Sequence, residues 1–289
     1  MIPMDQAIIE LFREQGYIAI PYLISADEVA AARQALADMM LGMLADAKAG
    51  RADYRPPIKG GTGNYDGAWV NTSEDPSYKK AGMLFERGFD PMTADPSEAL
   101  AYVRKAQYYE DAHPVFRALV DSPRIKGIAQ ELLGEDVVLF QTMALVKPPL
   151  IGSEKPWHQD NAYFKYAPLE QVCGFWLALD DAEADNGCMH VLPGWHRRGG
   201  LKHYHAGDCQ IMPDRLEDAK PVPIELPAGG AMFFSGMLPH QTPPNRSTKP
   251  RRALQFHYRG ASTKPVDQAE YNRLFAEADG TPASCAAAL

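Results

Sequence analysis

Apolar residues in the first half of the chain recur at helical spacing, between residues that typically start and stop helices. Asp5 caps one such segment, which ends before Gly16. Ser25 and Glu28 form a capping box ahead of a stretch rich in Ala, Leu and Met that continues to about residue 47. The pattern predicts helices over residues 5–15, 26–47, 97–110 and 122–134.

After residue 134 the pattern changes to short apolar or alternating segments that are separated by Gly, Pro, Asn and Asp. We predict a mainly β protein with flanking α-helices, in which an antiparallel double sheet or barrel carries an N-terminal helical part packed outside it. The predicted strands cover residues 136–147, 172–180, 188–192, 222–226, 231–234 and 251–258, and a shorter strand covers 17–20.

Two segments lack a clear period and are interpreted as loops. Residues 50–96 are rich in Gly, Pro, Asp and Tyr, and residues 196–221 are polar. Loops this long are commonly functional, so we expect them to cover a substrate, with Tyr54, Tyr65, Trp69 and Tyr204 as contacts. No repeat or linker divides the chain, and we expect one domain over 1–289, with a helix-rich part (1–134), a β core (about 135–260) and a C-terminal extension (261–289).

Composition limits the class of protein. With 46% hydrophobic residues the chain can build a core, and the net charge of −8 disfavours a general nucleic-acid or anionic-membrane binder. No apolar run is long enough to span a bilayer, and Asp5, Glu10 and Glu14 interrupt the N-terminus where a signal peptide is apolar. The four cysteines form no CxxC pair, so we expect reduced thiols and a cytoplasmic location.

The segment Trp157-His158-Gln159-Asp160 contains the most informative spacing. Positions i and i+2 of a strand point to the same side, so His158 and Asp160 can present an imidazole and a carboxylate to one point. His240, shortly after the predicted strand 231–234, offers a second imidazole. Two His and one carboxylate on one face of an octahedral ion form the facial triad of non-haem Fe(II) oxygenases. HxD spacing by itself also occurs by chance, so further residues are needed.

Arg251 supplies that second signal. Strand alternation places Arg251, Gln255 and His257 on one face of the segment 251–258. A buried guanidinium beside a metal needs an anion, because an unpaired buried charge is costly. A dicarboxylate that chelates iron at one end and meets Arg251 at the other would satisfy both groups. Arg246 and Arg252 compete for this role.

Trp157–Asp160, the stretch 185–196 (DNGCMHVLPGWH), His240 and Arg251 together resemble the phytanoyl-CoA dioxygenase family, over about residues 7–260. The resemblance implies a double-stranded β-helix of the jelly-roll or cupin type. It also implies an oxygenase that uses Fe(II), 2-oxoglutarate and O2. The motifs are specific for the family and carry no information about the substrate.

The resemblance assigns roles residue by residue. His158, Asp160 and His240 would bind iron, and Arg251 would hold the distal carboxylate of 2-oxoglutarate. Further co-substrate contacts would come from Thr242, Gln141, Trp176 and, in a looser alignment, Lys105. Simpler explanations compete for some of them: Trp176 as core, Thr242 as a turn residue, and Lys105 as a solvated helix residue. Substrate contacts are expected from Asn161, Tyr163 and His257, whereas His203 and His205 are interpreted as surface histidines.

The function predicted in this way is hydroxylation or a related oxidation of a small organic molecule, with release of succinate and CO2. Related halogenases carry a small residue where this chain has Asp160, so a hydroxylase is expected. Two alternatives remain: a cupin-type hydrolase or isomerase that does not use 2-oxoglutarate, and a non-catalytic metal-binding barrel. The polar character of the loops favours a polar or amphipathic substrate over a long-chain acyl-CoA. The sequence does not determine the oligomeric state.

Overall fold

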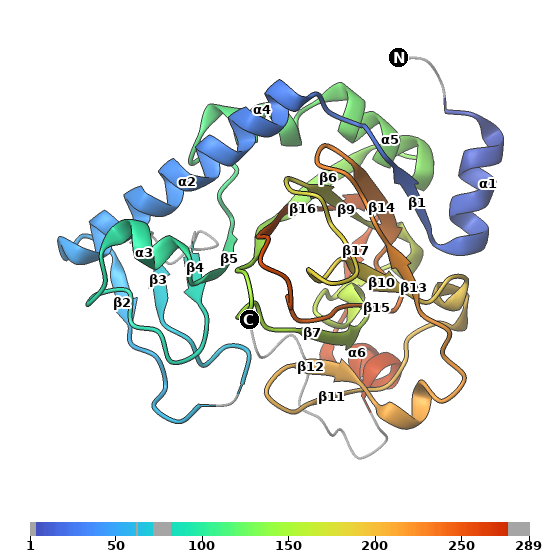
Figure 1. Ribbon diagram of the computed structural model, residues 1–289. Coiled ribbons are helices and arrows are strands. Elements are labelled where there is room, and N and C mark those ends of the chain that lie inside the picture. The colour runs from blue at the N-terminus through green and yellow to red at the C-terminus, as the bar shows by residue number, and fades with distance from the viewer. Residues whose placement is uncertain (1–3, 62, 72–81, 277–289) are drawn as a thin grey trace.

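Two antiparallel sheets face each other and enclose the centre of the protein in the computed structural model, which describes residues 4–61, 63–71 and 82–276 (Figure 1). The larger sheet has nine strands in the order β1-β14-β9-β16-β6-β5-β4-β3-β2. The smaller sheet has four strands in the order β13-β10-β15-β7. The predicted jelly-roll core flanked by helices is confirmed.

The strands of the larger sheet are β1 (Tyr17–Ile20), β2 (Asp53–Arg55), β3 (Trp69–Asn71), β4 (Gly82–Phe85), β5 (Val103–Gln107), β6 (Val137–Lys147), β9 (Val172–Ala178), β14 (Ala231–Ser235) and β16 (Arg251–Gly260). Those of the smaller sheet are β7 (Lys155–His158), β10 (Met189–Val191), β13 (Val222–Ile224) and β15 (His240–Thr242). Every strand predicted from the pattern is present, with ends that differ by at most two residues.

Alternation along the central strands separates two hydrophobic clusters. Phe175 and Phe256 point outward and pack with the helices, together with Phe233. Trp176 and Ala253 point inward and pack against residues of the smaller sheet. The central strands are therefore buried on both faces, which explains why their sequences are almost continuously apolar.

The helices cover the outer face of the larger sheet (Figure 1). They are α1 (Gln6–Gln15), α2 (Ala26–Lys48), α3 (Pro96–Leu100), α4 (Pro114–Val120) and α5 (Pro123–Leu133), whereas α6 (Gln268–Phe275) packs in a separate small cluster with Ala162 and Met237. The expected caps are present: Asp5 accepts from the Ala7 N–H, Ser25 and Glu28 form the capping box, and α5 ends at Gly134 in the left-handed region.

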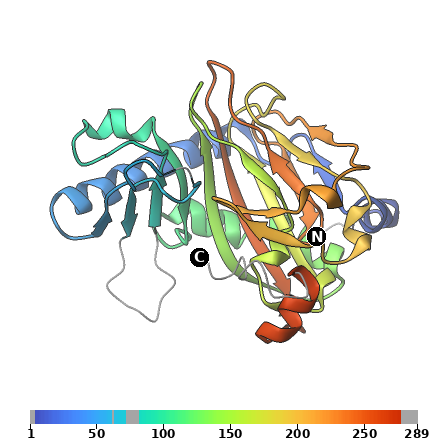
Figure 2. The ribbon, with the colours of Figure 1, turned by 90° about the horizontal axis from the view of Figure 1, so that it is seen from below.

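The prediction for residues 50–110 is wrong in part. The segment 50–96 contains β2, β3 and β4, which extend the larger sheet beside α2 (Figures 1 and 2). Residues 103–107, expected within a helix over 97–110, form β5 between β4 and β6. These strands are only three to five residues long, so pairing with distant partners determines their conformation more than local periodicity does.

The segment 196–221 is also partly ordered into regular structure. It contains the hairpin β11 (His203–His205) and β12 (Cys209–Ile211), and Cys209 packs in a small cluster with Tyr271 and Phe275 of α6. A two-stranded pair joins β8 (Tyr166–Ala167) to β17 (Lys264–Pro265).

The expectation of four reduced cysteines is wrong for Cys209. Cys173 and Cys188 are free and buried, whereas Cys209 is disulfide-bonded. Sequence spacing gave no sign of this, because the fold decides which cysteines meet.

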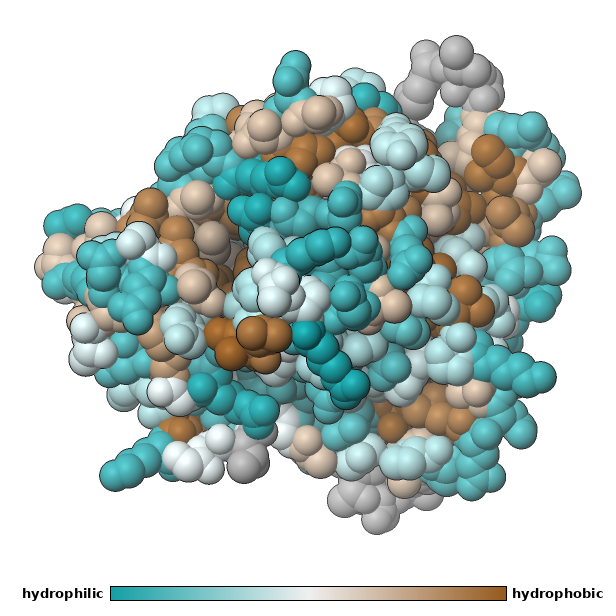
Figure 3. Space-filling view, in the orientation of Figure 1, coloured by the Kyte–Doolittle hydropathy of each residue, from teal (hydrophilic) through white to brown (hydrophobic). Residues whose placement is uncertain are grey.

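Among the described residues, no helix is both long and apolar enough to cross a membrane. The face of the molecule seen in Figure 3 is mainly hydrophilic, and its hydrophobic side chains form small separate areas.

Candidate metal centre

Pairing between β7 and β15 places the two expected metal-binding histidines side by side. His158 ends β7 and lies directly opposite His240, the first residue of β15. Gln159 continues in an extended conformation, so Asp160 returns to the side of His158 before the chain enters a 3-10 turn at Asp160–Ala162. His158 and Asp160 therefore point to the same side, as their spacing predicted, although the strand ends at His158.

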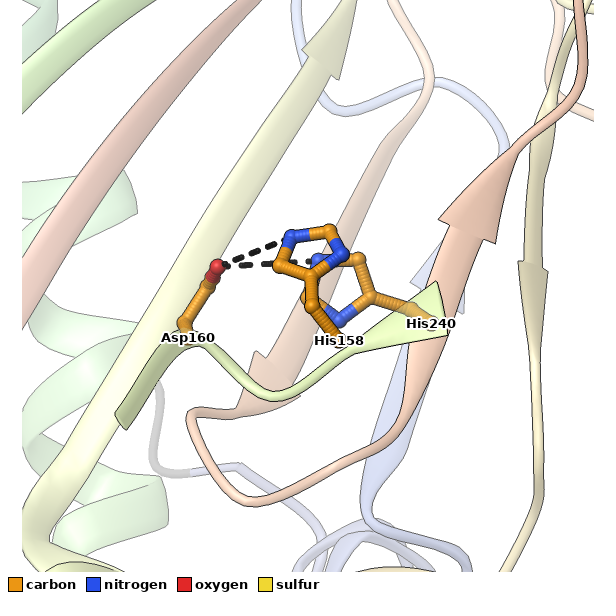
Figure 4. A group of neighbouring side chains, drawn as sticks. All are labelled: His158, Asp160 and His240. Atoms are coloured by element: carbon orange, nitrogen blue, oxygen red, sulfur yellow. Dashed lines mark ion pairs between the residues drawn. The ribbon is translucent and has the colours of Figure 1, made fainter. Parts of the chain in front are cut away.

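The three side chains converge on one point between the sheets (Figure 4). Their candidate ligand atoms lie within 4.8 Å of one another, and all three residues are buried. Nε2 of His158 is 3.4 Å and Nε2 of His240 is 3.7 Å from Oδ1 of Asp160. This donor set, two imidazoles and a carboxylate, fits a non-haem Fe(II) ion.

Backbone carbonyls orient both imidazoles. Nδ1 of His158 lies 2.8 Å from the Pro156 carbonyl, and Nδ1 of His240 lies 3.0 Å from the Leu238 carbonyl. A proton on Nδ1 that donates to these carbonyls leaves Nε2 unprotonated and free to bind a metal.

Charges at the centre also suit a metal. Burial alone would raise the pKa of Asp160, but the neighbouring His240 and His257 hold it well below its usual range. Burial, to which the neighbouring His158 adds, lowers the pKa of His240 to about 3. These shifts favour a carboxylate and an unprotonated imidazole, the forms in which both groups bind a metal.

A further pair of side chains supports Asp160. Nε2 of His257 lies 2.8 Å from Oδ2 of Asp160, and the amide nitrogen of Gln255 lies 3.4 Å from the same oxygen. His257 is fully buried and does not line the cavity beside the centre. The structure thus places His257 behind Asp160, although the sequence suggested a substrate contact.

Arg251 is a buried cation that forms no ion pair within the described part of the chain. Its side chain is 1% exposed, one terminal N–H donates to the Leu145 carbonyl at 3.1 Å, and its Nε has no hydrogen-bond partner. Burial lowers its pKa to about 10. The two other arginines considered for binding the anion are placed differently. Arg252 forms three hydrogen bonds with Asp180, and Arg246 is exposed.

A cavity with an empty volume of about 850 Å³, including its open mouth, joins the metal centre to Arg251. Thr242, Gln141 and Lys105, for which the resemblance implied co-substrate contacts, line this cavity, and so does Tyr163, which was expected to contact substrate. Trp176 lies behind the residues that line the cavity. The Arg251 guanidinium is 5.6 Å from the centroid of the Trp176 ring, and the indole N–H of Trp176 is buried without a hydrogen-bond partner among the described residues. Asn161 is buried away from the cavity and donates to the Leu169 carbonyl.

The interpretation of Lys105 as a solvated helix residue is wrong. Lys105 lies on strand β5, is 7% exposed and faces the cavity. His203 was likewise taken for a surface residue, but it is only 1% exposed. Its ring accepts a hydrogen bond from the backbone N–H of Gln159 at 3.1 Å, which satisfies the buried imidazole. The neighbouring His205 is exposed as expected.

Sequence reasoning missed four charged residues that line the cavity: Arg104, Lys147, Lys155 and Asp208. Lys147 could have been found, because it is in phase with Gln141 along the predicted strand 136–147. Lys155 on β7 forms an ion pair with the buried Asp208 in the loop before β12, and the distance between them in sequence concealed this pair.

Comparison with known proteins agrees with this geometry. The family described as phytanoyl-CoA dioxygenase (PhyH) matches residues 12–253. A phytanoyl-CoA dioxygenase of Arabidopsis thaliana is 29% identical over 256 residues, which cover 86% of each chain. A methylphosphonate hydroxylase of Gimesia maris is 31% identical over 182 residues, which cover 61% of this chain and 67% of the relative.

Among solved structures, the non-haem α-ketoglutarate-dependent carbocyclase SnoK from nogalamycin biosynthesis has the same fold. Its TM-score is 0.64 at 23% identity, over 94% of this chain and 91% of that chain. The family match covers the metal centre and most of the core. The chain therefore belongs to the phytanoyl-CoA dioxygenase family.

Proposed function

We propose that this protein is an Fe(II)- and 2-oxoglutarate-dependent oxygenase whose iron ligands are His158, Asp160 and His240. The observation that carries the proposal is one cavity that joins a two-histidine, one-carboxylate centre to the unpaired cation Arg251. We also propose that the described core belongs to one oxygenase domain, since β1 and β2–β5 extend the same sheet as β6, β9, β14 and β16.

Arg251 would bind the distal carboxylate of 2-oxoglutarate, with Thr242 and Gln141 as further polar contacts. Two observations fit an acceptor at this place: the Nε of Arg251 and the indole N–H of Trp176 are both buried donors without a partner in the described residues. A carboxylate beside them would supply the counter-charge that a buried guanidinium needs.

When bound, Fe(II), 2-oxoglutarate and O2 supply an oxidation that releases succinate and CO2. The protein contributes position and environment. The carbonyls of Pro156 and Leu238 orient the two imidazoles, His257 orients Asp160, and the apolar cluster around Trp176 closes the inner end of the cavity to water. Such a fixed set of ligands is what a reactive metal site requires.

Asp160 favours hydroxylation or a related oxidation over halogenation, because its carboxylate occupies the coordination position that a halide would need. It is fixed in place by Gln255 and His257, which makes displacement costly. The two alternatives fit the structure less well. A hydrolase or isomerase has no need of the unpaired Arg251, and a non-catalytic barrel has no need of three oriented ligands.

A small molecule is the proposed substrate. The two relatives above are named for phytanoyl-CoA and for methylphosphonate, so family membership does not fix the substrate. Tyr, Lys, Arg and Asp side chains line the cavity, as expected for a polar or amphipathic compound.

Uncoupled turnover tests the function without a known substrate. Purified protein with Fe(II) and 1-¹⁴C-labelled 2-oxoglutarate in air should release labelled CO2 and form succinate, and His240→Ala should abolish both. Metal binding without any turnover of 2-oxoglutarate, in the presence of a broad panel of small organic acids, alcohols and phosphonates, would favour the alternatives.

A further inference from the structure

The C-terminal helix α6 packs close to the candidate metal centre, apart from the helices that cover the larger sheet. In Figure 1 it is the red helix seen beside β7 and β12. Its buried residues Tyr271 and Phe275 form a small cluster with Ala162, Met237 and Cys209. The family match ends at residue 253, before α6 begins, so the contacts of this helix are the guide to its role.

Tyr271 is hydrogen-bonded to the turn that begins at the proposed metal ligand Asp160. The turn covers Asp160–Ala162, and the Tyr271 hydroxyl donates to the Ala162 carbonyl. The last carbonyl of a helical turn has no partner within the turn, and a buried carbonyl that loses its donor is costly. Ala162 is fully buried, so solvent does not reach this acceptor. Tyr271 therefore fixes the end of the turn.

A second contact of α6 supports the chain on the other side of Asp160. The Phe275 ring meets the His203 ring edge-on, with the two centroids 5.8 Å apart. Nε2 of His203 in turn accepts the hydrogen bond from the backbone N–H of Gln159, the residue before Asp160. The helix therefore supports the backbone both before and after this ligand.

Contacts at both of its ends hold α6 in place. It has eight residues, and isolated helices shorter than about 12 residues are marginal in water. At its start the Lys165 ammonium group donates to the Gln268 side chain at 2.5 Å, and at its end Lys202 donates to the Arg273 carbonyl at 2.8 Å. The helix therefore depends on docking against segments that adjoin the metal centre.

We propose that α6 is part of the metal centre and that Tyr271 is a positioning residue, which fixes the turn of Asp160 in the orientation that its carboxylate needs to bind a metal. This inference rests on the proposed metal centre of the oxygenase and adds an element that lies beyond the family match. Because α6 docks on the turn that carries Asp160, metal binding and docking of the helix stabilise each other.

A matched pair of conservative variants tests the role of Tyr271. Tyr271→Phe keeps the ring and removes one hydroxyl. Tyr258→Phe does the same at a buried tyrosine whose hydroxyl donates to the Val120 carbonyl at 3.0 Å, on the outer face of the larger sheet. Anaerobic competition with a chromophoric chelator gives the Co(II) affinity of each protein, visible absorption of bound Co(II) reports its ligand geometry, and urea unfolding gives the stability.

Both variants should be less stable than wild type, because each leaves a buried carbonyl without its donor. Only Tyr271→Phe should also lose Co(II) affinity, by about 3- to 10-fold, which is less than the loss expected for a direct partner of a ligating carboxylate. The absorption of bound Co(II) should change in Tyr271→Phe and match wild type in Tyr258→Phe, since only the first variant frees the turn of Asp160.

Hydrogen exchange of wild type tests the coupling without any variant. Binding of Co(II) should slow amide exchange in α6 at least about threefold more than in α4, which packs on the outer face of the larger sheet. The comparison with α4 separates local coupling from a general gain in stability, because a general gain would slow exchange in both helices.

Three results would overturn the inference, and they are distinguishable. Equal Co(II) affinity and equal absorption in Tyr271→Phe and Tyr258→Phe would make Tyr271 a packing residue only. Equal slowing of exchange in α6 and α4 would show that the helix is not coupled to the metal centre. Both of these results would leave the proposed function intact, whereas absence of Co(II) and Fe(II) binding by wild type would overturn the metal centre itself, and this inference with it.

Discussion

Oδ2 of Asp160 lies 2.8 Å from Nε2 of His257, while Oδ1 of the same carboxylate faces His158 and His240. One oxygen is thus available to a metal and the other is held by a fully buried imidazole. Hydrogen bonds of this kind fix the orientation of a ligating carboxylate. His257 is therefore a positioning residue for the metal centre.

Replacement of His257 by Leu should weaken metal binding about 10- to 100-fold, because Oδ2 of Asp160 would keep only the long contact from Gln255. The measurement is an anaerobic competition for Co(II) or Fe(II) between the protein and a chromophoric chelator. His205→Gln, which alters an exposed histidine, is the matched control and should bind metal like wild type. Equal affinity of His257→Leu and wild type would remove the positioning role.

Arg251→Met should separate co-substrate binding from stability. The variant loses a buried charge that has no ion-pair partner, so its melting temperature without 2-oxoglutarate should not fall below that of wild type. Its affinity for 2-oxoglutarate should fall about 100-fold, since a charge-assisted contact with a carboxylate is lost. Saturating 2-oxoglutarate should accordingly stabilise the wild type and not the variant.

Arg252→Met is the control for that experiment. Arg252 is paired with Asp180 at 2.7 Å, so its loss should lower the melting temperature and leave the 2-oxoglutarate affinity unchanged. The reverse pattern for the two arginines would show that Arg252 holds the co-substrate.

His203 should make the metal-free protein sensitive to acid. Burial lowers the pKa of His203 to about 3, while an unfolded chain has a histidine pKa of about 6.5. Below pH 6.5 the unfolded state therefore binds a proton that the folded state does not, so the free energy of unfolding falls as the pH decreases, by at most about 1.4 kcal/mol per pH unit from this residue.

Urea unfolding between pH 6.5 and 4 measures that slope. In His203→Phe the slope should be smaller by up to about one proton, even though loss of the acceptor for the Gln159 N–H lowers stability at every pH. In His205→Gln the slope should match wild type. Equal slopes for His203→Phe and wild type would mean that His203 titrates normally.

Gly187, within the family motif 185–196, has a structural task. Its φ is +86°, and a Cβ at this position would lie 2.5 Å from the Pro243 carbonyl oxygen and 2.7 Å from Cδ of Lys147. Gly187→Ala should destabilise the protein by about 1–3 kcal/mol, and it should weaken 2-oxoglutarate binding by moving Lys147 and β15.

Gly42 offers the opposite case. It is an exposed glycine inside α2, where a Cβ meets nothing within 4 Å, so Gly42→Ala should stabilise the protein by about 0.5–1 kcal/mol. Chemical denaturation measures the free energy of unfolding of both variants. A Gly187→Ala variant as stable as wild type would contradict the close contacts that the structure shows at this position.

Local sequence features predicted a large part of this molecule. Ser25 and Glu28 marked the start of α2, and the apolar run 172–180 marked the central strand β9, because capping and burial leave signals in neighbouring residues. For the same reason, the spacing of His158 and Asp160 predicted the candidate metal centre, and the phase of Arg251 predicted that its side chain faces the same cavity.

Features that depend on distant partners were missed. Strands β2–β5 are short and form by pairing along the edge of the large sheet, so Lys105 was assigned to a helix. The burial of His203 depends on the backbone of Gln159, and the pairing of Lys155 depends on Asp208. The last two contacts join residues 44 and 53 positions apart, and periodicity within a short window reports neither these contacts nor the strand pairing.

The most direct test of the iron and 2-oxoglutarate site is an anaerobic titration of metal-free protein with Fe(II) and then with 2-oxoglutarate, followed by visible absorption. We expect a charge-transfer band in wild type, no band in His158→Ala, and a band in Arg251→Ala only at far higher 2-oxoglutarate concentration. A wild-type protein that binds Fe(II) tightly and shows no band at saturating 2-oxoglutarate would contradict the proposed site and favour another cupin-type metalloenzyme.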